Sequence, residues 1–447
     1  MTDTIFALST ARGRAGVAVF RLSGPQAGAT VERLTGRAPP PPRRAALRAF
    51  QDPLRGHEID RGLVLFFGAP ASFSGEDMAE FHVHGGRGVI EAMTSALGAC
   101  DGLRPADAGE FTRRAFENGK MDLTAVEGLA DLIAAETEAQ RAQALRQMRG
   151  RLGALYEDWR SRLVSALAHL EAEIDFAEEE LPEDMWQRVR PGLEELAREI
   201  GRHLDDDRRG ERLRDGYRVV LLGAPNAGKS SILNSLARRD AAIVAETAGT
   251  TRDVIEVHLD LDGLPVTIVD TAGLREATEV VEVEGVRRAL GAAEAADLKL
   301  FVAEAPHWET DVARLEPLLD ERSMVLVNKC DLEPGLVLPG AVPTGQGMLT
   351  VSAKTGAGMP ELMTALAQAV SAGLEASDAP PITRARHRQA LEDCRSHLAA
   401  ALAGDGTASE VVAEDLRLAA RALGRLTGRV DVEDILDVVF ADFCIGK

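Results

Sequence analysis

A glycine-rich loop between an apolar strand and a helix constrains this chain more than any other feature. The segment GAPNAGKS (223–230) matches G-x-x-x-x-G-K-[ST], follows the apolar run RVVLL and precedes SILNSLARR. Gly223 and Gly228 let the backbone curl so that its N–H groups face phosphates. Lys229 would place a charge on the β- and γ-phosphates, and the Ser230 hydroxyl suits Mg²⁺. A chance match in a turn is the alternative, and the strand-to-helix context argues against it.

Two further segments have the chemistry of a magnesium and γ-phosphate site. GTTR offers the adjacent hydroxyls of Thr250 and Thr251, one of which would complete the Mg²⁺ shell when the γ-phosphate is bound. DTAG follows the apolar run LPVTIV. Asp270 would hold Mg²⁺ through water, and the Gly273 N–H would meet the γ-phosphate. Either motif alone is common by chance, so the assignment depends on their order along the chain after the glycine-rich loop.

The segment NKCD (328–331) identifies the base. A carboxylate at Asp331 can accept hydrogen bonds from N1–H and N2–H₂ of guanine, whereas adenine would leave it unpaired, which carries a large energetic penalty. SAK (352–354) then supplies a loop that suits guanine O6. A polar strand end is the alternative for NKCD. With five elements in order, we predict a P-loop GTPase that binds GTP and Mg²⁺.

The residue that orients the attacking water cannot be assigned from the motif, because Leu274 stands where Ras-like proteins have a water-orienting glutamine. Leucine cannot polarise water, so the carboxylates in REATEVVEVEG (275–285) are candidates. Asn226 adds a neutral oxygen to the phosphate loop and could ligate a monovalent cation in place of an arginine finger. The alternative is that Asn226 only hydrogen-bonds the neighbouring loop.

The predicted nucleotide site therefore comprises residues from all five segments. They are Gly223, Asn226, Ala227, Gly228, Lys229, Ser230, Ser231, Ala245, Glu246, Thr247, Ala248, Gly249, Thr250, Thr251, Asp270, Thr271, Ala272, Gly273, Asn328, Lys329, Asp331, Ser352, Ala353 and Lys354.

Composition limits the partners. The formal net charge is −20, the opposite of the basic surface that a general nucleic-acid coat needs, although a local basic patch remains compatible with it. No apolar run reaches membrane-span length, and MTDTIFALSTARGR lacks a signal peptide pattern, so we expect a cytoplasmic protein without membrane contact. The cysteines are too far apart for a zinc or disulfide framework: Cys100, Cys330, Cys394 and Cys444.

The pattern changes along the chain predict a multidomain α/β and α+β protein. Short strand-like runs and glycine turns are followed by alanine-, leucine- and glutamate-rich helical segments. An α/β segment interrupts the helical part, which favours a Ras-like P-loop domain inserted into a helical domain, with three consecutive domains as the alternative. The predicted boundaries are 1–118 (α+β), 119–214 (first helical half), 215–372 (GTPase) and 373–447 (second helical half).

Over essentially its whole length the sequence resembles the MnmE (TrmE) family of tRNA-modifying GTPases. The resemblance rests on DTIFALST (3–10), GVAVFRLSGP (16–25), SFSGEDMAEFHVHGG (72–86), EFTRRAFENGKMDLTAVEGLADLI (110–133), the GTPase motifs and FCIGK (443–447). It implies a homodimer whose N-terminal domains dimerise and bind a reduced folate such as 5-formyltetrahydrofolate. It also implies a heterotetramer with an MnmG-type flavoprotein, which adds an aminomethyl or carboxymethylaminomethyl group to C5 of the wobble uridine of certain tRNAs.

The resemblance also implies roles for individual residues. Arg21, Glu80, Lys120 and Lys447 match the folate contacts, and Glu282 matches the carboxylate that orients the attacking water, making Glu282 and Lys229 the candidate catalytic residues. Ser230 and Thr251 match the Mg²⁺ ligands. Asn226, Thr250 and the carbonyls of Ala245 and Thr247 match K⁺ ligands, and Cys444 matches a cysteine near the C-terminus.

Other interpretations stay open at this point. His82 and His84 alternate on an expected strand and could bind a metal, but packing or hydrogen bonding is the more ordinary role. A regulatory GTPase for ribosome or RNA assembly, without modification chemistry, is the alternative function. A third interpretation, a folate-dependent one-carbon transferase with an acquired GTPase, differs from the first only in its acceptor.

Overall fold

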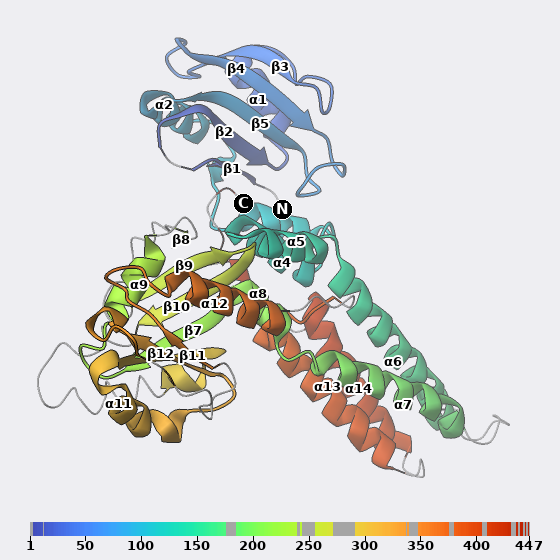
Figure 1. The fold of residues 1–447 in the computed structure, drawn as a ribbon. Coiled ribbons are helices and arrows are strands. Elements are labelled where there is room, and N and C mark those ends of the chain that lie inside the picture. Colours follow the sequence, from blue (N-terminus) through green and yellow to red (C-terminus); the bar gives the residue numbers. More distant parts are fainter. Residues whose placement is uncertain are drawn as a thin grey trace, which may run out of the picture. The chain divides into compact units, whose positions relative to one another are not determined.

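The computed structural model describes residues 3–11, 13–175, 185–238, 242–243, 255–270, 291–336, 338, 347–374, 380–404, 409–430, 435–436, 439–440, 443 and 446 (Figure 1). The chain forms two compact units, which we describe separately. Unit 1 contains residues 1–130, 147–189 and 400–447, and unit 2 contains residues 131–146 and 190–399.

Unit 1 begins with a six-stranded sheet in the order β3-β4-β5-β2-β1-β6. Its strands pair antiparallel except for β1 and β6, which are parallel. Burial alternates along β2 from Ala18 to Leu22, so its successive side chains point to a fully buried face and to a partly exposed one. The strands are β1 Thr4–Leu8, β2 Ala15–Ser23, β3 Ala46–Gln51, β4 Glu58–Phe67, β5 Met78–Gly85 and β6 Leu103–Pro105.

One face of this sheet packs against two helices in a large core, and the other face packs against one helix in a smaller cluster. The helices α1 (Ala27–Thr35) and α2 (Arg87–Gly98) bury one face in the main core, where Phe20 and Leu22 of β2 point. On the other face, α3 (Glu110–Glu117) contributes Phe111 to a smaller cluster. Arg21 lies between Phe20 and Leu22 in sequence, so it faces the second side.

The alanine- and leucine-rich stretch over residues 124–176 is divided into three helices: α4 (Leu123–Ala134), α5 (Glu138–Met148) and α6 (Arg151–Asp175). The next helix, α7 (Met185–Leu204), contains Pro191 in its interior. The ring lies at an exposed position, so water can bond the carbonyl that proline leaves without a partner.

Unit 2 is built on a seven-stranded sheet in the order β13-β12-β11-β7-β10-β9-β8. The strands β13, β12, β11, β7 and β10 are parallel, and β9 and β8 continue the sheet antiparallel. Crossovers between parallel strands place helices on both faces of such a sheet. The strands are β7 Tyr217–Gly223, β8 Ala242–Ile243, β9 Ile255–Leu261, β10 Leu264–Asp270, β11 Leu298–Glu304, β12 Ser323–Asn328 and β13 Met348–Thr350.

Both faces of the central strands of this sheet are buried. Val219 and Leu221 of β7 pack into one cluster with α9 (Lys229–Ala237) and α12 (Met359–Gly373). Val220 and Leu222 pack into the cluster on the opposite face, which includes residues of α11 (Trp308–Leu315). This double burial explains why the strand reads RVVLL, a continuous apolar run rather than an alternating one.

The α/β segment is inserted between helices. In unit 2, Arg388 of α13 (Ala385–Ala403), which follows that segment, donates to Asp206 Oδ1 (2.6 Å) and to the Leu204 carbonyl (2.9 Å) at the end of α7, which precedes it. The short helix α8 (Arg209–Asp215) then leads into β7. In unit 1, α14 (Ser409–Thr427) packs on α6. Among the described residues, no helix is long and apolar enough to cross a membrane.

Candidate functional site

The loops of the predicted nucleotide site all follow strands that end at one edge of the unit 2 sheet. Parallel strands present their carboxyl ends together, and ligands bind outside those ends. The pairing register sets these ends nearly level, with Asp270 beside Leu221, Val302 beside Gly223, Asn328 beside Glu304 and Thr350 beside Val327.

The phosphate-binding loop requires glycine at two positions. Gly223 has φ 145° and Gly228 has φ 92°, a region that residues with a side chain rarely adopt. A Cβ on Gly223 would collide with the Val302 carbonyl, and one on Gly228 with the Asn328 amide. Asn226, also in this loop, has φ 67° and is exposed. Its side chain makes no hydrogen bond to the residues that the structure describes.

Lys229, Ser230 and Asp270 gather at the start of α9. The Lys229 ammonium, on a largely buried side chain, donates to the carbonyls of Gly223 (3.0 Å) and Ala224 (2.9 Å). Ser230 Oγ donates to Oδ2 of the buried Asp270 at 2.7 Å. A hydroxyl and a carboxylate in contact are oxygen donors of the kind that Mg²⁺ prefers, so these residues fit that ion.

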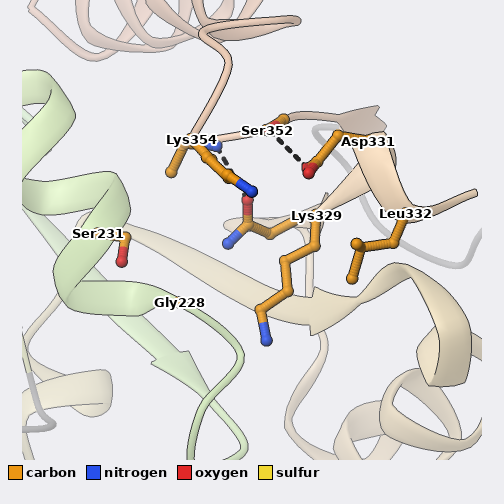
Figure 2. A pocket seen from close by; sticks show the side chains of 9 residues that line it. Gly228, Ser231, Lys329, Asp331, Leu332, Ser352 and Lys354 are labelled. Atoms are coloured by element: carbon orange, nitrogen blue, oxygen red, sulfur yellow. Dashed lines mark hydrogen bonds between the residues drawn. The ribbon is translucent and has the colours of Figure 1, made fainter.

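A pocket of about 260 Å³ lies beside this loop, with the NKCD and SAK segments in its wall (Figure 2). Ser352 Oγ donates to Asp331 Oδ1 at 2.7 Å, which orients the carboxylate. Asn328 connects the walls, since its Nδ2 donates to the Ala227 carbonyl (2.8 Å) and its Oδ1 accepts from the Ala353 N–H (3.2 Å). Figure 2 shows Lys329 extending away from Asp331 and Ser352.

The pocket is lined by residues of the phosphate-binding loop, of NKCD and of SAK, all of which were predicted, and by Leu332, which was not. The lining residues are Gly228, Ser231, Asn328, Lys329, Asp331, Leu332, Ser352, Ala353 and Lys354. Leu332 was missed because an apolar residue after NKCD has no distinguishing signal in the sequence. Its position directly after Asp331 is the only indication the sequence offers.

Many predicted site residues lie outside the described part of the chain, and their assignments stay predictions. They are Ala245, Glu246, Thr247, Ala248, Gly249, Thr250, Thr251, Thr271, Ala272, Gly273, Glu282, Cys444 and Lys447; Leu274 is also outside it.

In unit 1 two of the predicted folate contacts, Arg21 and Glu80, lie on the second face of the N-terminal sheet. Arg21 of β2 and Glu80 of β5 are direct cross-strand partners, and Arg21 Nη2 lies 2.9 Å from Glu80 Oε1. The Arg21 guanidinium also lies 5.6 Å from the Phe73 ring centre and 5.9 Å from that of Phe111. A cation held against aromatic faces beside a carboxylate is a rigid polar site in apolar surroundings.

Lys120 is joined to the Arg21 and Glu80 pair through the loop between β4 and β5, which carries Phe73. Lys120 Nζ donates to the Pro70 carbonyl at 2.9 Å, and Asn118 Nδ2 donates to the Ser74 carbonyl at 2.8 Å. Phe73 belongs to that loop, so the residues around Lys120 hold the segment that covers Arg21.

The C-terminus also reaches this part of unit 1. Ser9 Oγ donates to the Gly446 carbonyl at 3.0 Å, and Gly446 lies against the backbone of Leu8 and Ser9. Leu8 ends β1, whose Ala7 pairs with Arg21. The residue before Lys447 is therefore one strand away from Arg21.

The two histidines of β5 form hydrogen bonds. His82 Nε2 lies 3.4 Å from Glu80 Oε2, and His84 Nδ1 lies 2.8 Å from Asp60 Oδ1. The His84 backbone and side-chain hydrogen bonds outweigh the desolvation of Asp60 and lower its pKa. No group of three or more metal-ligating side chains occurs among the described residues.

The glycine loop, the Ser230–Asp270 pair and the guanine-type pocket at the carboxyl edge of a mostly parallel sheet define a P-loop GTPase. A family model described as MnmE helical domain matches residues 123–444, and one described as GTP-binding protein TrmE N-terminus matches residues 4–120. The chain belongs to the MnmE (TrmE) family. It is an enzyme that binds GTP with Mg²⁺ and hydrolyses the nucleotide.

Curated relatives match over the full length. A "tRNA modification GTPase MnmE" of Parvibaculum lavamentivorans is 60% identical over 447 residues, with 100% of both chains covered. A protein with the same description from Paramagnetospirillum magneticum is 54% identical over 448 residues, again with 100% of both covered. Among solved structures, the G domain of the T. maritima FeoB iron transporter is 23% identical and covers 34% of this chain and 97% of its own, with a TM-score of 0.28.

The carboxylate of Asp331 should set the base preference. In Asp331→Asn the acceptor for N1–H and N2–H₂ of guanine is lost, while the amide can donate to the additional carbonyl of xanthine. We expect weaker GDP binding and stronger xanthosine diphosphate binding, each by at least about tenfold. Titrating GDP and xanthosine diphosphate against the wild type and the variant measures this change of base preference. A variant that retains full guanine preference would show that NKCD does not recognise the base.

Proposed function

We propose that this protein, with an MnmG-type flavoprotein, adds an aminomethyl or carboxymethylaminomethyl group to C5 of the wobble uridine of certain tRNAs. The one-carbon unit comes from 5-formyltetrahydrofolate or a related reduced folate, and GTP hydrolysis drives the cycle. The observation that carries the proposal is the full-length match to tRNA modification GTPases, which spans both the N-terminal unit and the nucleotide-binding unit.

For the nucleotide reaction, the residues of this chain act by position and charge. Lys229 and the loop N–H groups would hold the β- and γ-phosphates, and Ser230 with Thr251 would hold Mg²⁺, whose charge would offset that of the phosphates. Glu282 orients the attacking water, because Leu274 cannot. Asn226, Thr250 and the carbonyls of Ala245 and Thr247 would hold K⁺, which would supply the positive charge that an arginine finger provides elsewhere. The exposed Asn226 amide, with no hydrogen bond to the described residues, supports this role.

For the one-carbon donor, the polar group on the second face of the N-terminal sheet has matching chemistry. A folate carries a glutamate tail, which suits Arg21, Lys120 and Lys447, and a pterin edge with N–H donors, which suits the Glu80 carboxylate. The contact of Phe73 with the Arg21 guanidinium and the position of Gly446 support a shared pocket. Cys444 lies in the same C-terminal segment and remains a candidate functional cysteine.

We further propose a homodimer formed through the N-terminal sheets, which joins the flavoprotein in a heterotetramer that works on tRNA in the cytoplasm. An exposed apolar cross-strand pair supports a partner on this sheet, because Leu47 and Leu63 are 69% and 40% exposed. The alternative, a regulatory GTPase for ribosome or RNA assembly, is not favoured, since the relatives that match the whole chain are described as tRNA modification GTPases.

Deleting the gene tests the proposed modification directly. We expect the C5-modified wobble uridine to disappear from tRNA of the deletion strain and to return on complementation with the wild-type chain. A Lys229→Ala chain, which lacks the charge on the phosphates, should fail to restore it. Mass spectrometry of tRNA nucleosides provides the measurement. Unchanged nucleosides in the deletion strain would leave the regulatory GTPase as the better interpretation.

The donor site predicts a selective loss of folate binding. Arg21→Ala should weaken 5-formyltetrahydrofolate binding at least about tenfold, because a charge-assisted contact to a carboxylate is lost. Arg61→Ala is the matched control, since Arg61 is exposed on the same sheet and pairs only with the neighbouring Glu58 among the described residues. Calorimetry should show the loss for Arg21→Ala alone. Deletion of residues 444–447 should abolish modification with GTP hydrolysis retained. Wild-type affinity in Arg21→Ala would remove Arg21 from the site.

The cation mechanism predicts a salt preference in the rate. Hydrolysis should be faster in KCl than in NaCl at equal ionic strength, and Asn226→Ala should lose that difference. Glu282→Ala should bind GTP normally but lose turnover, with a barrier increase of about 2–4 kcal/mol for a lost water-orienting group. Phosphate release assays in both salts measure this. Equal wild-type rates in KCl and NaCl would contradict the mechanism.

A further inference from the structure

We infer that Glu304 is a positioning residue of the guanine site and that it acts through Lys329. The Lys329 ammonium lies 2.7 Å from Glu304 Oε1. Lys329 lines the pocket beside the predicted guanine reader Asp331, whereas Glu304 is not part of the pocket wall. This inference rests on the proposed assignment of the pocket to the guanine base.

The sheet places the two side chains together. Glu304 is the last residue of β11 and pairs in register with Asn328, the last residue of β12, and Lys329 follows directly. The Glu304 N–H donates to Asp311 Oδ2 at 3.2 Å, which fixes the end of β11. Lys329 has φ 62°, an uncommon backbone conformation for a residue with a long side chain. The backbone therefore holds both side chains in place from two adjacent strands.

The contact determines where the Lys329 stem lies. A free lysine side chain populates many rotamers, and ordering it on binding costs about 0.5–1.5 kcal/mol. Figure 2 shows the stem extending away from Asp331 and Ser352, so it forms a different side of the pocket from the hydrogen-bonding edge of the base. Glu304 holds the ammonium at the far end of this stem. The nucleotide thus meets an ordered aliphatic surface that does not depend on which purine substituents are present.

This geometry distinguishes Glu304 from Asp331 in a binding experiment. Glu304→Gln keeps the shape but removes the ion pair, so the Kd for GDP should rise about two- to twelvefold, the range given by the cost of ordering one such side chain. The Kd for inosine diphosphate should rise by the same factor, because the Lys329 stem extends away from Asp331, the predicted reader of the 2-amino group. Asp331→Asn should instead change the ratio of the Kd for GDP to the Kd for inosine diphosphate. Glu309→Gln, at an exposed position on the adjacent α11, is the matched control and should leave both Kd values unchanged.

A double-variant cycle tests whether Glu304 acts through Lys329. If it does, Glu304→Gln should cause no further loss in a Lys329→Met background, whereas independent roles would add. Melting temperatures of all variants exclude unfolding as the cause. Wild-type Kd values in Glu304→Gln, additive losses, or a changed guanine-to-hypoxanthine ratio would each overturn the inference. If the wild type itself shows no preference for GDP over ADP, the proposed guanine pocket fails instead.

Discussion

The parallel pairing of β7 with β10 and β11 is the constraint on which the nucleotide site depends. It brings Gly223, Asp270 and Glu304, which are far apart in sequence, to one edge of the sheet. Because each strand is buried on both faces, a one-residue slip would bring different side chains into each core and displace the loop at its end. The same burial leaves that edge as the place where polar loops can meet a ligand. The 2.7 Å contact between Ser230 and Asp270 is a direct result.

A buried ion network has a comparable role in the N-terminal unit. Arg114 is fully buried and pairs with Asp3, Glu76 and Glu110, so the loss of its charge would remove one shared cation from three carboxylates. Glu76 in turn accepts from Ser23 Oγ, which ties the loop that carries Phe73 to β2. The Arg104 hydrogen bond lowers the pKa of Asp3 and keeps that carboxyl charged. The loop that carries Phe73 and covers Arg21 of β2 is therefore held by ion pairs and hydrogen bonds of Glu76.

The hairpin of β9 and β10 connects the nucleotide edge with the helical part of unit 2. Its turn at residues 262–263 has positive φ at both positions, the geometry of a tight two-residue hairpin. The Gly263 carbonyl accepts from the Ala139 N–H at 3.1 Å, which satisfies one free donor of the first turn of α5. At the other end of the hairpin stand Ile255 and Asp270, next to the GTTR and DTAG segments. This contact explains why α5 groups with the GTPase sheet rather than with α6.

The sequence alone determined the chemistry of the nucleotide site and the class of the fold. Gly223, Gly228 and Asp331 could be recognised because only glycine tolerates those backbone angles and only a carboxylate accepts both donors of guanine, so local motifs carry the information. The register of strands and the breaks between α4, α5 and α6 depend on packing across distant segments, and a single alanine-rich pattern does not encode them. The tertiary structure alone decided that Arg21 faces Glu80, that Gly446 lies against Ser9 and that Lys329 meets Glu304. These contacts join residues far apart in sequence, whose proximity follows only from sheet pairing.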